Sequence, residues 1–283
     1  MRVHIGEGVR LFVDVDGFGL VADDSGAAMR DRPTIIAMHG GPGFDHVGPK
    51  LGLGPLRDVG QLVVYDHRGH GRSDWRTPDE WTLDTWADDV VRLCEALGIE
   101  RPIVLGHSFG GFVAQRYLVR HPGHASKVIL YATMAHGRLD AIVGGFRAVG
   151  GNGAAEAARA FWSAPSAITG ARFRELCRPL YTRSDQPIAS DALTTRNEAV
   201  FAHFLAQEMW TMDHRALLAD VACPVLVLSG EHDPVCEPTS TEDLVEALPT
   251  TRTTWVPFQN SSHVIAVDEP EAFLATIRAF ITS

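Results

Sequence analysis

Cysteine and long apolar runs are both scarce in this chain of 283 residues. The spacing of its cysteines shows neither pairs nor a metal-ligand pattern, so we expect free thiols, no metal and a reducing, cytoplasmic setting. No stretch approaches the roughly 20 apolar residues of a membrane helix. The first 17 residues alternate like a strand and contain no continuous apolar segment for secretion. The cysteines are Cys94, Cys177, Cys223 and Cys236.

The chain has fewer positively charged than negatively charged side chains. Lys and Arg number 25 against 35 Asp and Glu, which gives a formal net charge of −10, and the acids are spread along the chain. This balance disfavours nucleic acid and an anionic membrane as partners. We expect a small-molecule or short peptide substrate instead. The composition leaves the oligomeric state open, and with 45% hydrophobic residues the chain can bury a large core.

Short apolar runs recur along the chain, with helical segments between several of them. Each run ends in Gly, His, Ser or Asp, and such continuous runs are typical of parallel strands buried on both faces. They predict an α/β fold with a mostly parallel, doubly wound sheet. An alternating stretch, "VRLFVDVDG", precedes them and predicts a β-hairpin. The runs are "TIIAMHG", "QLVVYDHRG", "PIVLGHS", "KVILYAT" and "PVLVLSGEHD", and "TTWVPF" follows near the end.

The pattern of strands stops between about residues 135 and 213. This stretch holds Gly- and Ala-rich helical pieces with scattered aromatic residues. It predicts a helical cap, 135–213, inserted into a core domain made of 1–134 and 214–283. Trp162 and Trp210 are candidates for substrate contact in an apolar pocket. The alternative is that these aromatic side chains belong to the core of the cap.

One serine has the surroundings of a nucleophile. "GHSFG", residues 106–110, fits the G-x-S-x-G pattern, with a strand before it and the helical run "FGGFVAQRYLVRH" after it. A sharp strand-to-helix turn would expose the Ser108 hydroxyl beside a helix N-terminus, whose dipole favours a developing anion. Side chains at Gly106 and Gly110 would clash in such a turn. A plain structural turn is the alternative.

A serine nucleophile needs a base, and the base needs an orienting acid. In this architecture the chain order is serine, acid, histidine. After the run "PVLVLSG", Asp233 is the preferred acid, with Glu231 and Glu237 as rivals. His263 is the histidine that follows the last predicted strand, and it is the predicted base.

Acyl transfer also needs donors for the oxyanion. The backbone N–H of Phe109, the residue after the serine, is one candidate. The other is Gly41 in "HGGPG", residues 39–43, because Pro42 has no N–H and Gly40 lies nearer the strand. A tight loop with nothing to bind is the alternative interpretation of these glycines.

A further glycine-rich strand end, "YDHRGHGRSD", covers residues 65–74. His67 and His70 have a spacing that could suggest metal ligands, but two histidines without a third ligand are common by chance. We prefer a structural interpretation, in which Asp66 and Arg68 or Arg72 hold the loop by hydrogen bonds.

Several motifs, in their order along the chain, resemble those of the α/β-hydrolase fold family. They are "HGGPG", "DHRGHGRSD", "GHSFGG", "GEHDP" and the late His263. The serine disfavours its dehalogenases and epoxide hydrolases, which use aspartate there. "HGGPG" resembles the proline iminopeptidase branch, whose cap carries acids that bind the substrate's free amine. The resemblance implies such a role for Glu198, in "RNEAVFAHF", and for Glu208. For each of the two, a solvated helix charge is the preferred interpretation. The cap is short for that branch, and Phe109 stands where the branch commonly has tryptophan.

These residues predict a cofactor-free serine hydrolase that cleaves an ester or amide through an acyl-enzyme. A proline iminopeptidase-like aminopeptidase is preferred, followed by a small-molecule esterase, lactonase or amidase, and then a carbon–carbon bond hydrolase. A ligand-binding sensor with a slow triad is a hypothesis of another class, and a purely structural role is a third.

Overall fold

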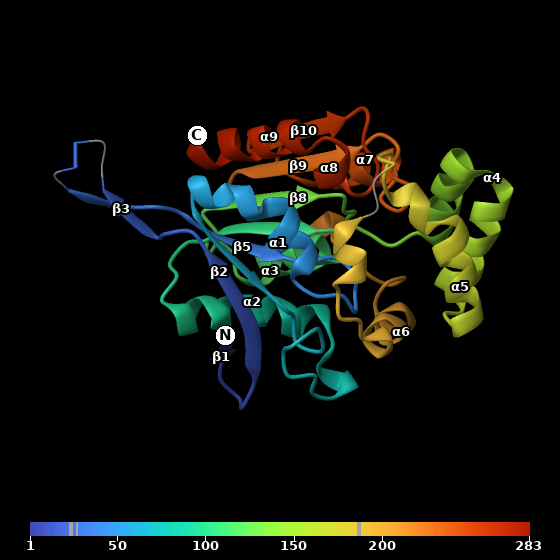
Figure 1. Ribbon diagram of the computed structural model, residues 1–283, viewed down its shortest axis with the longest axis horizontal. Coiled ribbons are helices and arrows are strands. Elements are labelled where there is room, and N and C mark those ends of the chain that lie inside the picture. The colour runs from blue at the N-terminus through green and yellow to red at the C-terminus, as the bar shows by residue number, and fades with distance from the viewer. Residues whose placement is uncertain (23–24, 27, 186–187) are drawn as a thin grey trace.

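A computed structural model describes residues 1–22, 25–26, 28–185 and 188–283. An eight-stranded sheet crosses its centre in the order β1-β2-β6-β5-β7-β8-β9-β10 (Figure 1). The first two strands are antiparallel to their neighbours, and all the others pair in parallel. The mostly parallel α/β prediction is therefore confirmed. The strands are β1 Arg2–His4, β2 Arg10–Asp16, β5 Thr34–Met38, β6 Gln61–Tyr65, β7 Ile103–His107, β8 Lys127–Tyr131, β9 Val225–Gly230 and β10 Thr253–Phe258.

The central strands are apolar throughout because both faces of the sheet are covered. In β5, Ile36 and Met38 belong to the core on one face, and Ile35 and Ala37 belong to the core on the other. All four side chains are fully buried. Burial on both faces removes the usual alternation of polar and apolar residues.

Helices cover the two faces of this sheet. The core on one face includes residues of α2 and α3, and the core on the other includes residues of α1 and α9. Within the described ranges no helix is long and apolar enough to cross a membrane. The helices are α1 Val47–Leu53, α2 Leu83–Leu97, α3 Phe109–Arg120, α4 Leu139–Ser163, α5 Ala167–Leu176, α6 Glu198–Gln207, α7 Pro238–Ala247, α8 Ile265–Asp268 and α9 Pro270–Thr282.

Helix α2 shows how local sequence sets an element. The Thr82 hydroxyl accepts from the Thr85 N–H at 3.1 Å and caps the N-terminus. Gly98 ends the helix in the left-handed region, at φ 66°. Of the apolar face at spacings of three and four, Trp86, Val90 and Leu93 are fully buried, and Leu97 is half-buried.

Two hairpins lie near the N-terminus. The predicted hairpin is formed by β1 and β2, with Val3 opposite Leu11. A second one, β3 (Leu20–Ala22) with β4 (Met29–Asp31), was not predicted. It projects from the body of the molecule (Figure 1). Strands of three residues are too short to show an alternating pattern, so the sequence carried no signal for them.

Helices α4, α5 and α6 occupy the segment between β8 and β9 that the sequence assigned to a cap. Residues 186 and 187 of this segment lie outside the described residues. The two ends of the segment lie side by side, since an isolated β-bridge joins His136 to Asp213. The His214 N–H also donates to the Ala135 carbonyl at 2.9 Å. The boundaries 135 and 213 of a separate cap stay a prediction.

Candidate active site

Ser108 lies at a sharp turn between β7 and α3. Its backbone has φ 51° and ψ −116°, a conformation that L-residues rarely adopt. Three hydrogen bonds hold it there: Ser108 N–H donates to the Tyr131 carbonyl at 3.1 Å, and the Ser108 carbonyl accepts from Gly111 N–H at 2.8 Å and from the Thr133 hydroxyl at 2.9 Å. The turn is therefore over-determined by its neighbours, as strained functional backbone usually is.

The glycines beside Ser108 permit close backbone approach. A Cβ built on Gly106 would lie 2.4 Å from the Gly110 carbonyl oxygen. A Cβ on Gly110 would lie 2.5 Å from the Met38 carbonyl oxygen, and one on Gly111 would lie 2.4 Å from the Thr133 hydroxyl. A side chain at Gly106 would push β7 away from α3, and one at Gly110 or Gly111 would push the turn away from β5 or from Thr133, which follows β8.

The structure brings three distant side chains together. His263 Nε2 lies 3.1 Å from Ser108 Oγ, and His263 Nδ1 lies 2.8 Å from Asp233 Oδ2. All three are buried; Ser108 retains 8% of its surface and His263 retains 3%. This is the nucleophile–base–acid order of a catalytic triad, at hydrogen-bond distances.

Asp233 is the acid that meets His263, and its rivals point elsewhere. Its other oxygen, Oδ1, accepts from the N–H groups of Val235 at 2.8 Å and Cys236 at 2.9 Å. Glu231 is exposed. Glu237 caps α7 by accepting from Thr239 N–H at 2.8 Å.

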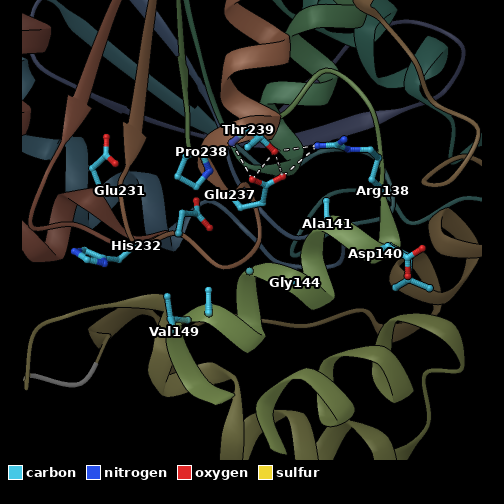
Figure 2. Close-up of a pocket in the computed structure, with 14 residues that line it drawn as sticks. Arg138, Asp140, Ala141, Gly144, Val149, Glu231, His232, Glu237, Pro238 and Thr239 are labelled. Carbon is cyan, nitrogen blue, oxygen red and sulfur yellow. Dashed lines mark hydrogen bonds and ion pairs between the residues drawn. The ribbon is translucent and has the colours of Figure 1, made fainter. Parts of the chain in front are cut away.

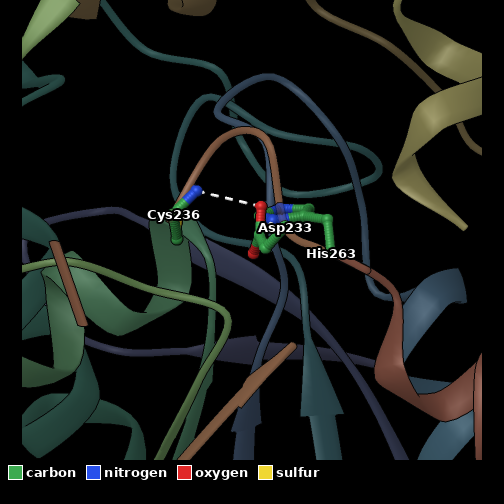
Figure 3. Close-up of side chains that lie close together, drawn as sticks. All are labelled: Asp233, Cys236 and His263. Carbon is green, nitrogen blue, oxygen red and sulfur yellow. Dashed lines mark hydrogen bonds and ion pairs between the residues drawn. The ribbon is translucent and has the colours of Figure 1, made fainter. Parts of the chain in front are cut away.

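Asp233, Cys236 and His263 also form a close group of possible metal ligands (Figure 3). Each of these ligand atoms is already engaged within the protein. The Cys236 thiol donates to the Ala132 carbonyl at 3.1 Å, and burial raises the pKa of this thiol well above its ordinary value. A protonated, hydrogen-bonded thiol is a poor metal ligand, so the group fits a hydrogen-bonded relay better. All four cysteines are free thiols.

The "HGGPG" loop passes beside the serine. A Cβ built on Gly40 would lie 3.4 Å from Ser108 Cβ. His39 Nδ1 lies 2.8 Å from the Gly40 carbonyl oxygen, so this carbonyl is held toward His39. In a trans peptide the N–H of Gly41 points the opposite way from that carbonyl. Gly41 itself has φ 129°, which glycine tolerates.

Phe109 is the first residue of α3, where a helix leaves its N–H groups without intrahelical partners. Its ring is fully buried and packs edge-on against Trp86, with ring centroids 5.0 Å apart. Of the two predicted oxyanion donors, Gly41 follows Gly40, which lies against Ser108, and Phe109 directly follows the serine in the chain. Their role stays a prediction.

The acids predicted to bind an amine have different surroundings. Glu198 is exposed in the first turn of α6, directly after Asn197. Asn197 N–H donates to the Gly43 carbonyl at 2.8 Å, which places this end of α6 against the "HGGPG" loop. Glu208 instead accepts from the Leu83 N–H at 2.8 Å and ties the end of α6 to the start of α2. Burial raises the pKa of Glu208.

The two predicted tryptophans lie in a group of aromatic rings. Trp162 is 7% exposed, and its ring centroid is 5.7 Å from that of Phe201 and 6.2 Å from that of Trp210. Within the described part of the chain, the buried Trp162 Nε1 has no hydrogen-bond partner. Trp210 is half-buried. Phe201 reaches the "HGGPG" loop, since its Cβ lies 3.7 Å from a Cβ built on Gly43.

The loop at residues 65–74 is held as the structural interpretation predicts. Asp66 accepts from Arg72 N–H at 2.8 Å, and Arg68 Nε donates to Asp89 at 3.0 Å. His70 Nδ1 lies 2.9 Å from the Arg68 carbonyl oxygen.

Two side chains beside His263 were not singled out from the sequence. The His107 ring lies 5.3 Å from that of His263 and stacks on Tyr131 at 4.4 Å. Burial lowers the pKa of His107 well below its ordinary value, so this imidazole stays neutral. Its place one residue before Ser108 could have identified it. Tyr181, whose ring centroid is 5.0 Å from that of His263, carries no such signal.

A groove of about 730 Å³ runs between α4 and the loop from β9 to α7 (Figure 2). Gly144 and Val149 line one side, and Glu231 and Glu237 line the other. Asp233 borders it, whereas Ser108 and His263 are not among its lining residues. The groove therefore lies beside the three-residue relay without containing the serine.

Comparisons with known proteins agree with this geometry. A family model described as the alpha/beta hydrolase fold matches residues 33–270. Proline iminopeptidase PfmaB of Pestalotiopsis fici is 35% identical over 125 residues, or 43% of each chain. Bifunctional esterase/perhydrolase DCH of Acinetobacter calcoaceticus is 33% identical over 120 residues, or 42% of each chain. The chain thus spans less than half the length of these two relatives.

Several solved structures match over the whole chain. Proline iminopeptidase of Mycobacterium smegmatis superposes with a TM-score of 0.80 at 25% identity, and the match covers 100% of this chain and 97% of that one. The chain belongs to the α/β-hydrolase fold family and resembles its proline iminopeptidases.

Proposed function

We propose that the protein is a serine hydrolase that cleaves an ester or amide bond through an acyl-enzyme. One observation carries this proposal: His263 lies within hydrogen-bond distance of both Ser108 Oγ, at 3.1 Å, and Asp233, at 2.8 Å. A neutral serine becomes a competent nucleophile only beside a general base that is itself oriented. The two distances from His263 support both conditions.

The proposed reaction has two halves. His263 Nε2 takes the Ser108 proton while Oγ attacks the substrate carbonyl carbon, and the carbonyl oxygen becomes an oxyanion. The N–H groups of Gly41 and Phe109 stabilise it; removing one such donor typically costs about 3–4 kcal/mol. The tetrahedral intermediate collapses, and His263 gives its proton to the departing alcohol or amine. Water, deprotonated by His263, then attacks the acyl-enzyme. The second tetrahedral intermediate collapses, the acid leaves, and His263 returns the proton to Ser108 Oγ.

As substrate we propose a short peptide or amide with an N-terminal proline, with aminopeptidase activity of the proline iminopeptidase type. The "HGGPG" motif and the similarity to two proline iminopeptidases support this class. Glu198 provides an exposed carboxylate next to Asn197, which contacts the "HGGPG" loop at Gly43. Trp162 and Trp210 would contact the apolar part of the substrate.

Four free thiols support the reducing, cytoplasmic location expected from the sequence.

A second candidate is a small-molecule esterase, lactonase or amidase. The partner of Glu208 favours it, because this carboxylate is bound by the Leu83 N–H at 2.8 Å. Glu198 is then the remaining predicted acid for a substrate amine. The similarity to an esterase/perhydrolase supports the same alternative.

The deciding experiment compares proline β-naphthylamide with p-nitrophenyl acetate and butyrate as substrates. We expect the amide to have the highest kcat/KM, and Ser108→Ala to abolish turnover of all three. Complete absence of amide hydrolysis with retained ester hydrolysis would establish the second candidate. Undiminished turnover by Ser108→Ala would refute the serine mechanism. Wild-type protein that binds these compounds without turnover would identify a sensor.

A further inference from the structure

A segment of the predicted cap lies directly on the loop that carries His263. This segment, residues 178–184, is called the strap below; it begins with the 3-10 helix η3, Arg178–Tyr181. Val264 N–H donates to the Tyr181 carbonyl at 2.9 Å. Ser262 Oγ donates to the Leu180 carbonyl at 2.6 Å. Both neighbours of His263 in the chain are thus hydrogen-bonded to the strap.

Asp268 also joins the strap to the loop that carries His263. Its Oδ1 accepts from Arg183 N–H at 2.8 Å, from Ser184 N–H at 3.1 Å and from the Thr182 hydroxyl. Its Oδ2 accepts from Ser262 N–H at 2.7 Å. One carboxylate therefore joins three residues of the strap to the residue before His263. Hydrogen bonds to an ionised acceptor are roughly twice as strong as neutral ones.

Tyr181 reaches the imidazole itself. Its ring meets that of His263 edge to face, with centroids 5.0 Å apart and planes at 76°. The Arg178 guanidinium lies over the Tyr181 ring at 4.5 Å, and Arg178 Nε donates to Asp191 Oδ2 at 2.7 Å. The Tyr181 ring is therefore held by Arg178, which is itself held by Asp191 outside the strap. Contact with a fixed ring limits rotation of the imidazole about its χ angles.

We propose that the strap is a positioning device for the base, with Asp268 and Tyr181 as positioning residues that keep His263 Nε2 directed at Ser108 Oγ. This inference rests on the proposed function, in which His263 is the general base. Neither residue touches the reacting atoms. Small displacements matter at such a site, because a misplacement of about 1 Å can cost on the order of 100-fold in rate.

The kinetic test uses one variant for each contact. Asp268→Asn retains an oxygen for the strap but loses the acceptor for Ser262 N–H, and Tyr181→Leu removes the ring. We expect each to lower kcat by roughly 10- to 100-fold while KM changes by less than about 3-fold. Tyr181→Phe restores the ring and should restore kcat to within about 2-fold. Val90→Ala, on the buried face of α2, is the control: it should lower stability at a residue outside the strap and the His263 loop, and its kcat should not change.

A second measurement needs no turnover. The proton on His263 Nδ1, hydrogen-bonded to Asp233, gives a downfield 1H NMR signal that His263→Ala assigns by its loss. We expect Tyr181→Leu and Asp268→Asn to broaden or shift this signal, whereas Tyr181→Phe and Val90→Ala leave it in place. An unchanged signal and unchanged kcat in both positioning variants would overturn the proposal, as would an equal loss of kcat in Val90→Ala.

The two proposals fail in different ways. If Ser108→Ala retained full turnover, the proposed function would fall, yet the NMR signal would still report whether the strap orients the imidazole. If Ser108→Ala abolished turnover while the positioning variants kept both kcat and the signal, only the role of the strap would fall.

Discussion

At residue scale, the site depends on a serine held at φ 51° and on glycines that let backbone segments touch. Gly106 sits where any side chain would meet the Gly110 carbonyl oxygen at 2.4 Å. The backbone at Gly110 cannot move to make room for such a side chain without also moving Ser108. The Ser108 carbonyl is held by the Gly111 N–H and the Thr133 hydroxyl. Hydrogen bonds thus hold the conformation of the nucleophile, and the glycines leave the space that it needs.

The first prediction concerns Gly106→Ala. The added methyl group should push the turn away from its hydrogen bonds, lower stability by about 1–3 kcal/mol and reduce ester turnover by at least tenfold. Urea unfolding and steady-state kinetics measure the two effects.

Gly153→Ala, inside α4, is the matched control. Its Cβ would meet nothing nearer than Leu176 at 3.9 Å. Replacing a helical glycine by alanine should stabilise the protein by up to about 1 kcal/mol and leave turnover unchanged. Equal behaviour of the two alanine variants would contradict the steric argument.

At the scale of elements, a buried ion pair joins the loop after β6 to α2. The Arg68 guanidinium contacts Asp89 at 2.7 Å and 3.0 Å, and the two side chains are 4% and 1% exposed. The Arg68 carbonyl also accepts from Trp86 Nε1 at 2.9 Å. Trp86 in turn packs against Phe109, so this contact leads from the loop to the start of α3.

The second prediction follows from this burial. Arg68→Met leaves the Asp89 carboxylate buried without its main partner, so we expect a loss of about 3–5 kcal/mol of stability. Arg120→Met removes a more exposed pair with Asp88 and should cost at most about 1 kcal/mol. Chemical denaturation of both variants measures the difference. A loss below 1 kcal/mol for Arg68→Met would show that the buried pair does not hold the loop.

At the scale of the whole molecule, burial of neutral histidines makes stability depend on pH. Burial lowers the pKa of His70 from 6.5 to about 3 and that of His214 from 6.5 to about 4. Below pH 6.5 the unfolded chain binds protons at these side chains and the folded chain does not. Their contribution is therefore present above pH 6.5 and is lost as the pH falls toward 4.

The third prediction is the size of the stability loss that each buried histidine causes as the pH falls. Between pH 7 and pH 5, each of these two histidines should lower the free energy of unfolding by about 2 kcal/mol. His214→Gln removes one such group, so this variant should lose about 2 kcal/mol less than the parent over the same interval. Urea unfolding at pH 5, 6 and 7 provides the comparison. Parallel losses in variant and parent would show that His214 titrates normally in the folded protein.

Several features followed from the sequence alone. The apolar runs at residues 34–38 and 103–107 determined buried parallel strands, because only a sheet covered on both faces accepts them. The G-x-S-x-G pattern predicted the turn at Ser108, because its requirement for glycine is local. The two three-residue strands β3 and β4 were missed, because they are too short for a period.

The tertiary structure decided what depends on long-range packing. It selected Asp233 over Glu231 and Glu237 as the partner of His263, because loop geometry and not sequence order sets where each carboxylate points. It gave Glu208 a backbone partner on α2, and it laid Tyr181 against His263. The sequence determined which groups could do the chemistry, since residue type and local turns are written in it. The contact between the Ser108 and His263 side chains, 155 residues apart, required the folded chain, because only packing sets their distance and direction.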